Sequence, residues 1–68
     1  MVIRITRSLM LHEVVTPEGE VRRRIPVFAG QQFAVNEVYD EFDGFDWMGP
    51  EEGGVMPLPP DAWEVAVA

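Results

Sequence analysis

The chain has 68 residues, with twelve acidic and five basic side chains, a net charge of −7 and no cysteine. A single domain of this size buries only about 60% of its unfolded surface, so its core must be small and closely packed. The lack of cysteine excludes disulfides, thiolate zinc sites and thiol nucleophiles. No apolar run approaches the roughly 20 residues of a membrane span, so we expect one cytoplasmic domain over residues 1–68 that does not enter a membrane.

The charge is divided unevenly along the chain. All five arginines lie in residues 1–34, whereas residues 35–68 carry nine acidic and no basic side chains. Phosphate backbones would repel this acidic excess, which argues against direct binding of nucleic acid. A basic surface on another protein is the more natural partner.

Glycine and proline divide the chain into short apolar runs, which is typical of a small all-β domain. The clearest unit is an N-terminal β-hairpin, because Thr16–Glu20 ("TPEGE") predicts a tight turn with Gly19 in the left-handed conformation. Counting outward from this turn pairs Val15 with Val21, Glu13 with Arg23, Leu11 with Ile25 and Leu9 with Val27. The opposite face, which includes Val14, is expected to be the wetter side.

Further strands are expected after the hairpin. Residues 33–39 alternate between two faces, with Phe33 and Tyr39 on the same side, and "DEFDG" turns the chain at Gly44. Residues 45–48 form a short strand whose aromatics, Phe45 and Trp47, are expected in the core. The prolines of residues 55–60 indicate an extended edge piece, and residues 63–68 close the chain as a strand. The pattern predicts a small five-stranded barrel or a rolled antiparallel sheet.

The run "DGFDWMGPEEGGVMPLPPDAWEV", residues 43–65, resembles the last part of Src-homology-3-like (SH3-like) barrels. In those barrels a Trp-bearing strand precedes a Gly-containing turn, an extended strand that ends in Pro, a 3₁₀ segment and a final strand led by an aromatic residue. Trp47, Pro57 and Trp63 occupy the corresponding places. The resemblance implies an SH3-like barrel with a short 3₁₀ turn before the last strand. The chain lacks the acidic and aromatic first-strand motif of the peptide-binding members, so only the architecture carries over.

In size and acidity the chain also resembles short barrel proteins encoded by bacteriophages. Such proteins act by binding and blocking a host protein. This second resemblance implies an inhibitor or accessory protein and assigns no site residue.

The acidic stretch Asn36–Glu52 does not have the ligand spacing of a calcium loop. A loop that starts at Asp40 has an aromatic residue and a glycine at its third and fifth positions, where oxygen ligands are required. Asp40, Asp43 and Asp46 could gather around a divalent cation only through folding of the loop, and the pattern leaves this weak site open. No cofactor is expected.

The pattern also lacks a catalytic arrangement. His12 and Glu13 are neighbours on a predicted strand and point to opposite faces, and Ser8 has no glycine-rich elbow around it. A ligand pocket needs about 300 Å³ or more, for which a domain of this size has little room. We therefore expect no enzymatic activity.

The acidic stretch instead favours a binding surface. Burial of unpaired carboxylates would cost on the order of several kcal/mol, so these groups must face solvent or meet a positive charge. We predict a non-catalytic acidic module that inhibits or modulates a larger protein by docking on a basic surface, for example one that binds nucleic acid. The predicted partner-binding residues are Tyr39, Asp40, Glu41, Asp43, Asp46, Glu51 and Glu52.

Two alternatives remain open from the residues alone. The acids could form no more than a solvated surface that keeps the protein soluble. The chain could also be a structural protein that self-assembles, so that the basic first half of one copy meets the acidic second half of another.

Overall fold

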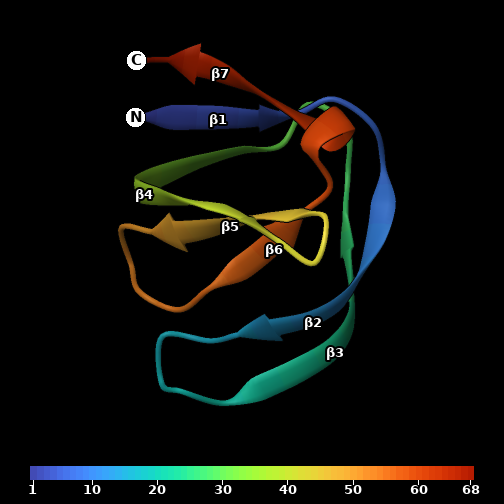
Figure 1. Cartoon of the computed structure of the whole chain (residues 1–68), viewed down its shortest axis with the longest axis vertical. Coiled ribbons are helices and arrows are strands. Elements are labelled where there is room, and N and C mark those ends of the chain that lie inside the picture. Colours follow the sequence, from blue (N-terminus) through green and yellow to red (C-terminus); the bar gives the residue numbers. More distant parts are fainter.

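The computed structural model describes the backbone of residues 1–68 and the side chains of residues 1–39 and 43–68. The chain forms seven antiparallel strands and one short 3₁₀ turn (Figure 1). The strands are β1 Val2–Ile5, β2 Leu9–Val15, β3 Val21–Val27, β4 Gln32–Phe42, β5 Phe45–Pro50, β6 Met56–Leu58 and β7 Trp63–Val67, and the turn η1 is Pro60–Ala62. The predicted 3₁₀ turn before the last strand is confirmed.

The strands form two sheets that do not close into a barrel. Five of them lie in the order β6-β5-β4-β1-β7, and β2 and β3 form a separate hairpin, at the bottom of Figure 1. The predicted all-β antiparallel class is confirmed, but the structure has seven strands rather than five. The sheets do not close because β4 starts beside β1 instead of beside β3. Gly30 N–H donates to Ile5 O, and Ile5 N–H donates to Gln31 O, both at 2.8 Å.

Strand β1 is absent from the sequence prediction, because no glycine or proline marks the bend between Ile5 and Leu9. Hydrogen bonds to distant segments hold this bend instead. Thr6 N–H donates to Ala62 O at 2.9 Å, and the Ser8 hydroxyl accepts the Ala29 N–H at 2.9 Å. The turn at Ser8 is therefore set by tertiary contacts that a local sequence pattern does not contain.

The predicted hairpin is confirmed, including its register. Val15 pairs with Val21 and Glu13 with Arg23, and Thr16 N–H donates to Glu20 O at 2.8 Å. The prediction for Val14 is wrong, since this side chain packs against the core. Arg24, with φ of +56°, interrupts the regular alternation, and the end of β2 turns toward the other sheet.

The core draws on both sheets, which is why they stay together. Phe33, Trp63 and Val14 are among the half-buried side chains that pack against it. Its buried members are Ile3, Ile5, Leu11, Val27, Val35, Met48, Met56 and Leu58.

The expectation that Phe45 belongs to the core is wrong, and Trp47 is half-buried without being among the buried core members. Phe45 is 39% exposed, and the core side of β5 instead carries Met48. Tyr39 is 51% exposed, because the register of β4 with β5 shifts between Val35 and Glu37. A one-residue shift moves every following side chain to the other face.

Strand β7 also departs from the predicted alternation. Ile3 pairs with Val65 and Val2 pairs with Val67, so the ladder is irregular at this step. The predicted alignment of Trp63, Val65 and Val67 on one face is therefore interrupted. Strand β7 remains at the end of the five-stranded sheet, next to β1 only.

A short junction joins the hairpin to the larger sheet. Val15 and Val55 exchange two backbone hydrogen bonds, each of 2.9 Å. Gly54, with φ of +86°, precedes Val55, and a Cβ built at this position would overlap the carbonyl oxygen of Val15. Glycine is required here both for its backbone conformation and for the close approach of the two chains.

We expect Gly54→Ala to destabilise the fold by more than about 2 kcal/mol, because it adds a backbone clash to left-handed strain. Gly53→Ala is the matched control: Gly53 also has a positive φ, of +104°, but its Cβ would lie 3.5 Å from Pro17, an ordinary contact. This control should cost about 1 kcal/mol from strain alone. Urea unfolding of both variants measures the difference. Equal losses would contradict the proposed close approach.

Candidate functional site

The predicted acidic site divides between the two ends of β5. Asp43 lies in the β4/β5 turn with φ of +56°, whereas Glu51 and Glu52 follow the other end of the strand. Glu51 N–H donates to Ala34 O at 3.0 Å, which holds the start of the β5/β6 turn against β4. The side chains of Asp40 and Glu41 lie outside the described residues.

Asp46 has a different environment from the predicted one. Its side chain is half-buried and accepts a 2.9 Å hydrogen bond from the indole Nε1 of Trp63 on β7. The sequence predicted that the acids of this stretch face solvent or meet a positive charge, and Asp46 instead is half-buried against a neutral donor. This carboxylate ties β5 to the start of β7.

Tyr39 is exposed and interacts with a neighbouring acid. The hydrogen bond and negative charge of the Glu37 carboxylate raise the pKa of the Tyr39 phenol. The phenol thus stays protonated over a wider pH range and can donate a hydrogen bond.

Four of the five arginines form ion pairs within the chain. Arg4 meets Glu64 at 2.6 Å and Arg7 meets Asp61 at 2.8 Å, so two acids of the second half are neutralised by β1 and the bend after it. The other two pairs lie within the hairpin and are Arg22–Glu20 at 2.8 Å and Arg23–Glu13 at 3.1 Å.

These pairs leave the described acids around β4 and β5 without an arginine. Within the described side chains, no arginine lies within salt-bridge distance of Glu18, Glu37, Asp43, Asp46, Glu51 or Glu52. Only Asp46 among them has a half-buried side chain. The structure thus concentrates uncompensated negative charge at the two turns that flank β5.

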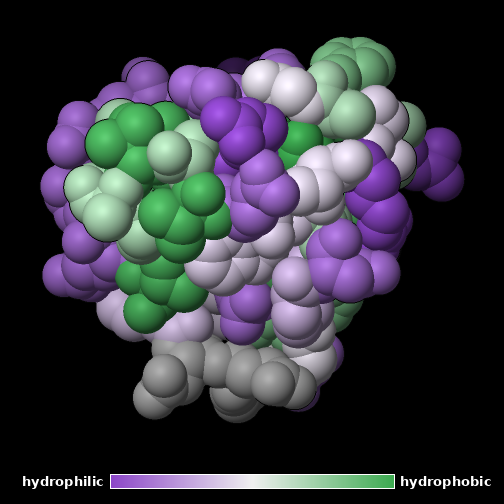
Figure 2. Space-filling view, turned by 90° about the horizontal axis from the view of Figure 1, so that it is seen from above, coloured by the Kyte–Doolittle hydropathy of each residue, from purple (hydrophilic) through white to green (hydrophobic). Residues whose placement is uncertain are grey.

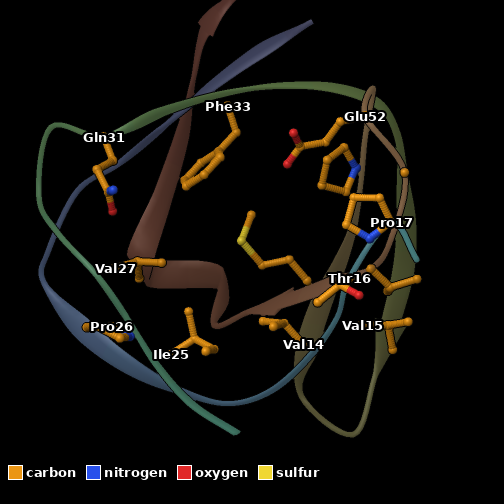
Figure 3. Close-up of a pocket in the computed structure, with 14 residues that line it drawn as sticks. Val14, Val15, Thr16, Pro17, Ile25, Pro26, Val27, Gln31, Phe33 and Glu52 are labelled. Atoms are coloured by element: carbon orange, nitrogen blue, oxygen red, sulfur yellow. The ribbon is translucent and has the colours of Figure 1, made fainter. Parts of the chain in front are cut away.

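A pocket of about 280 Å³ lies between the hairpin and the larger sheet (Figure 3). Val14 and Ile25 from the hairpin and Phe33 from β4 form much of its apolar wall. Glu52 points its carboxylate into the same space from the β5/β6 turn. No basic side chain lines this pocket among the described residues.

A second hollow adjoins this pocket. It has a volume of about 330 Å³, shares Phe33, Pro50 and Glu52 with the pocket, and adds Glu51. Glu51 and Glu52 therefore lie beside one continuous depression that has an apolar floor. These two predicted site residues thus lie together beside one cavity, and Asp43 lines a different hollow.

A third hollow, of about 240 Å³, lies at the other end of β5 between β2 and β6. Phe45, Trp47 and Met10 give it an apolar lining, with Glu13 and Asp43 also present. Glu13 already pairs with Arg23. Asp43 therefore gives this hollow one carboxylate without an arginine, as Glu52 does for the pocket, and Glu51 adds a second one in the hollow that adjoins the pocket.

Within the described residues no group of three or more His, Asp or Glu side chains is placed to hold a metal ion. The proposed cation set of Asp40, Asp43 and Asp46 lies partly outside these residues. In the same part of the chain, no helix is long and apolar enough to span a membrane.

Sequence reasoning missed the apolar half of the site. Val14, Ile25 and Phe33 come from three different strands, and their meeting depends on the Val15–Val55 junction. The "GG" pair at Gly53 and Gly54 was the available signal, since adjacent glycines mark a place where two backbones approach closely.

Comparison with protein families, with curated proteins and with solved structures gave no match for this chain. The chain is a small all-β antiparallel protein, and its site is interpreted from its own geometry.

The Arg7–Asp61 pair predicts a pH effect on stability. The hydrogen bond from Arg7 is the main cause that lowers the pKa of Asp61; desolvation opposes it, and the positive charge of Arg7 adds a further lowering. A carboxyl whose pKa is lower in the folded than in the unfolded chain stabilises the fold above the unfolded-state pKa, and this stabilisation is lost as the pH falls through the folded-state pKa.

We therefore expect the NMR titration midpoint of Asp61 to rise in Arg7→Gln. The difference in melting temperature between the wild type and this variant should shrink to nothing in acid. Arg24→Gln serves as the control, because Arg24 forms no salt bridge with a described side chain. An unchanged Asp61 midpoint in Arg7→Gln would show that the ion pair is absent in solution.

Proposed function

We propose that the chain is a non-catalytic acidic module that binds a basic surface of a larger protein and receives an arginine or lysine side chain of that protein in the pocket beside Glu52. The observation that carries this proposal is an apolar pocket with a carboxylate directed into it and no basic side chain in its described lining. Such a combination suits a ligand that is apolar along its length and cationic at its end.

The side chain of arginine has these properties. Its methylene groups would pack on Phe33, Ile25 and Val14, and its guanidinium would donate hydrogen bonds to Glu52. Hydrogen bonds between charged groups are shorter and stronger than neutral ones, particularly where water is excluded. A volume of about 280 Å³ accommodates one such side chain.

The remaining acids would act at longer range. Asp43 lies at the opposite end of β5 from Glu52, so the predicted residues do not form one contact patch around the pocket. Their charge, together with the net charge of −7, would instead accelerate the encounter with a basic partner. Salt would weaken this attraction.

The proposed role is that of an inhibitor or modulator in the cytoplasm, as the likeness to short bacteriophage proteins suggests. A kinship with SH3-like barrels is part of the same proposal, and the order of β5, β6, η1 and β7 supports it. Assembly of copies through basic and acidic halves is less favoured, because four of the arginines already meet carboxylates of their own chain.

The test uses a capped peptide of alternating arginine and glycine, titrated by calorimetry. We expect Glu52→Gln to weaken binding about tenfold, which corresponds to about 1.4 kcal/mol. The matched control is Asp43→Asn, which removes the same charge, and asparagine tolerates the left-handed backbone of this turn. It should weaken binding less than about threefold, through long-range attraction only.

Equal losses in the two variants would show that overall charge, and not the pocket, binds the peptide. No binding at low ionic strength would overturn the proposed function as a whole. A peptide of alternating lysine and glycine distinguishes the two cations, and weaker binding of lysine would indicate bidentate contact with Glu52.

A further inference from the structure

Strand β7 leaves one edge of the five-stranded sheet open. It lies at the end of the order β6-β5-β4-β1-β7 and pairs with β1 alone. An edge strand presents a row of backbone N–H and C=O groups that can pair with another strand. The partner that suits this edge is therefore an extended peptide backbone, which can pair with these groups.

The other strand edges carry features that hinder such pairing. Strand β6 has only three residues, and one of them is Pro57, which has no N–H to donate. On β3, Pro26 and the left-handed Arg24 interrupt the edge. The end of β2 is already bridged to Val55. Among the edges that the structure describes, β7 has no proline, and its one irregularity is the register shift between Val65 and Val67 in its pairing with β1.

The exposed side chains of β7 are apolar. Val65 is 49% exposed although it pairs with Ile3, which is fully buried, and Val67 is 61% exposed. Met1, at the neighbouring end of β1, is 40% exposed. Figure 2 shows hydrophobic side chains gathered on the side of the molecule where the two termini lie, over β7 and β1. The apolar side chains of β7 at this end of the core are thus exposed to solvent.

The charges beside this edge are neutralised. The Arg4–Glu64 and Arg7–Asp61 ion pairs, of 2.6 and 2.8 Å, pair both acids that lie in or next to β7. Of the acids without an arginine, Asp43, Glu51 and Glu52 lie at the two turns that flank β5. The half-buried Asp46 contacts Trp63 at the start of β7 through a neutral hydrogen-bond donor. Two copies of an acidic chain would therefore repel each other least where β7 meets β7.

We propose that β7 pairs antiparallel with β7 of a second copy, so that the two five-stranded sheets become one continuous sheet. A two-fold axis through Val65 places this residue against Val65 of the second copy and places Glu64 opposite Ala66 of the second copy. In this register like charges do not face each other directly, and the strand is complementary to itself.

The dimer is expected to be weak, because edge pairing of five-residue strands buries little surface. It should also strengthen with salt, since screening reduces the repulsion between two copies of charge −7. Binding of a basic peptide at Glu52 has the opposite salt dependence. No residue of β7 lines that pocket, so the two proposals stand or fall separately.

Sedimentation velocity of the whole chain over a range of concentrations, up to millimolar, tests the dimer. We expect a species of twice the chain mass of 7.7 kDa, with a dissociation constant that falls as NaCl is added. Val65→Lys should raise this constant by more than about tenfold, because lysine on an edge strand opposes pairing.

The matched control is Val21→Lys on β3. Val21 is 57% exposed and receives the same change of charge, but it lies far from β7 in the fold. It should leave the dimer intact or strengthen it slightly, since it reduces the net negative charge. Hydrogen exchange of the wild type provides a second measurement, in which amides of residues 64–67 become better protected as the concentration rises.

A chain that stays monomeric at millimolar concentration and high salt would overturn the proposal. A dimer that survives Val65→Lys, or that fails in Val21→Lys instead, would place the interface elsewhere and would also overturn it. Amide protection that rises with concentration outside β7, but not within β7, would also overturn the proposal.

Discussion

The two backbone hydrogen bonds between Val15 and Val55 are the contact on which the rest of the structure depends. They join the hairpin to the five-stranded sheet at the one place where Gly54 lets the two backbones approach closely. The core draws Leu11 and Val27 from the hairpin and the rest of its buried members from the larger sheet, so the core and this junction together hold the two sheets in place. A domain of 68 residues has no second core to compensate for its loss.

The same junction creates the pocket and positions its charge. Val14 and Thr16 stand on the hairpin side, Gly53 and Val55 stand on the side of the β5/β6 turn, and Glu52 reaches over the space between them. The gap between the two sheets thereby becomes an apolar depression with the Glu52 carboxylate at its rim. Local ion pairs use four of the arginines elsewhere, so the negative charge at this rim stays available to a partner.

Local pattern predicted the hairpin to the residue, because "TPEGE" defines the turn and the register follows by counting. The local pattern failed where contacts between segments that are distant in sequence determine the structure. The bend after Ile5 has no turn residue, and the shift in β4 between Val35 and Glu37 exposes Tyr39. Charge counting located Glu52 but not its apolar neighbours, since Val14 and Phe33 meet only through the tertiary junction. Asp46 looked like a surface acid because its partner, Trp63, is distant in sequence.

The central claim is that the space between the sheets receives a cationic side chain whose apolar length lies on Phe33 and Ile25. Intermolecular nuclear Overhauser effects between an arginine-containing peptide and the isotope-labelled chain test this claim most directly. The account predicts contacts from the arginine methylene protons to the Phe33 ring and the Ile25 methyl groups, lost in Glu52→Gln. Contacts confined to Phe45 and Trp47 at the other end of β5, or spread over the acidic surface with none at Phe33, would contradict it.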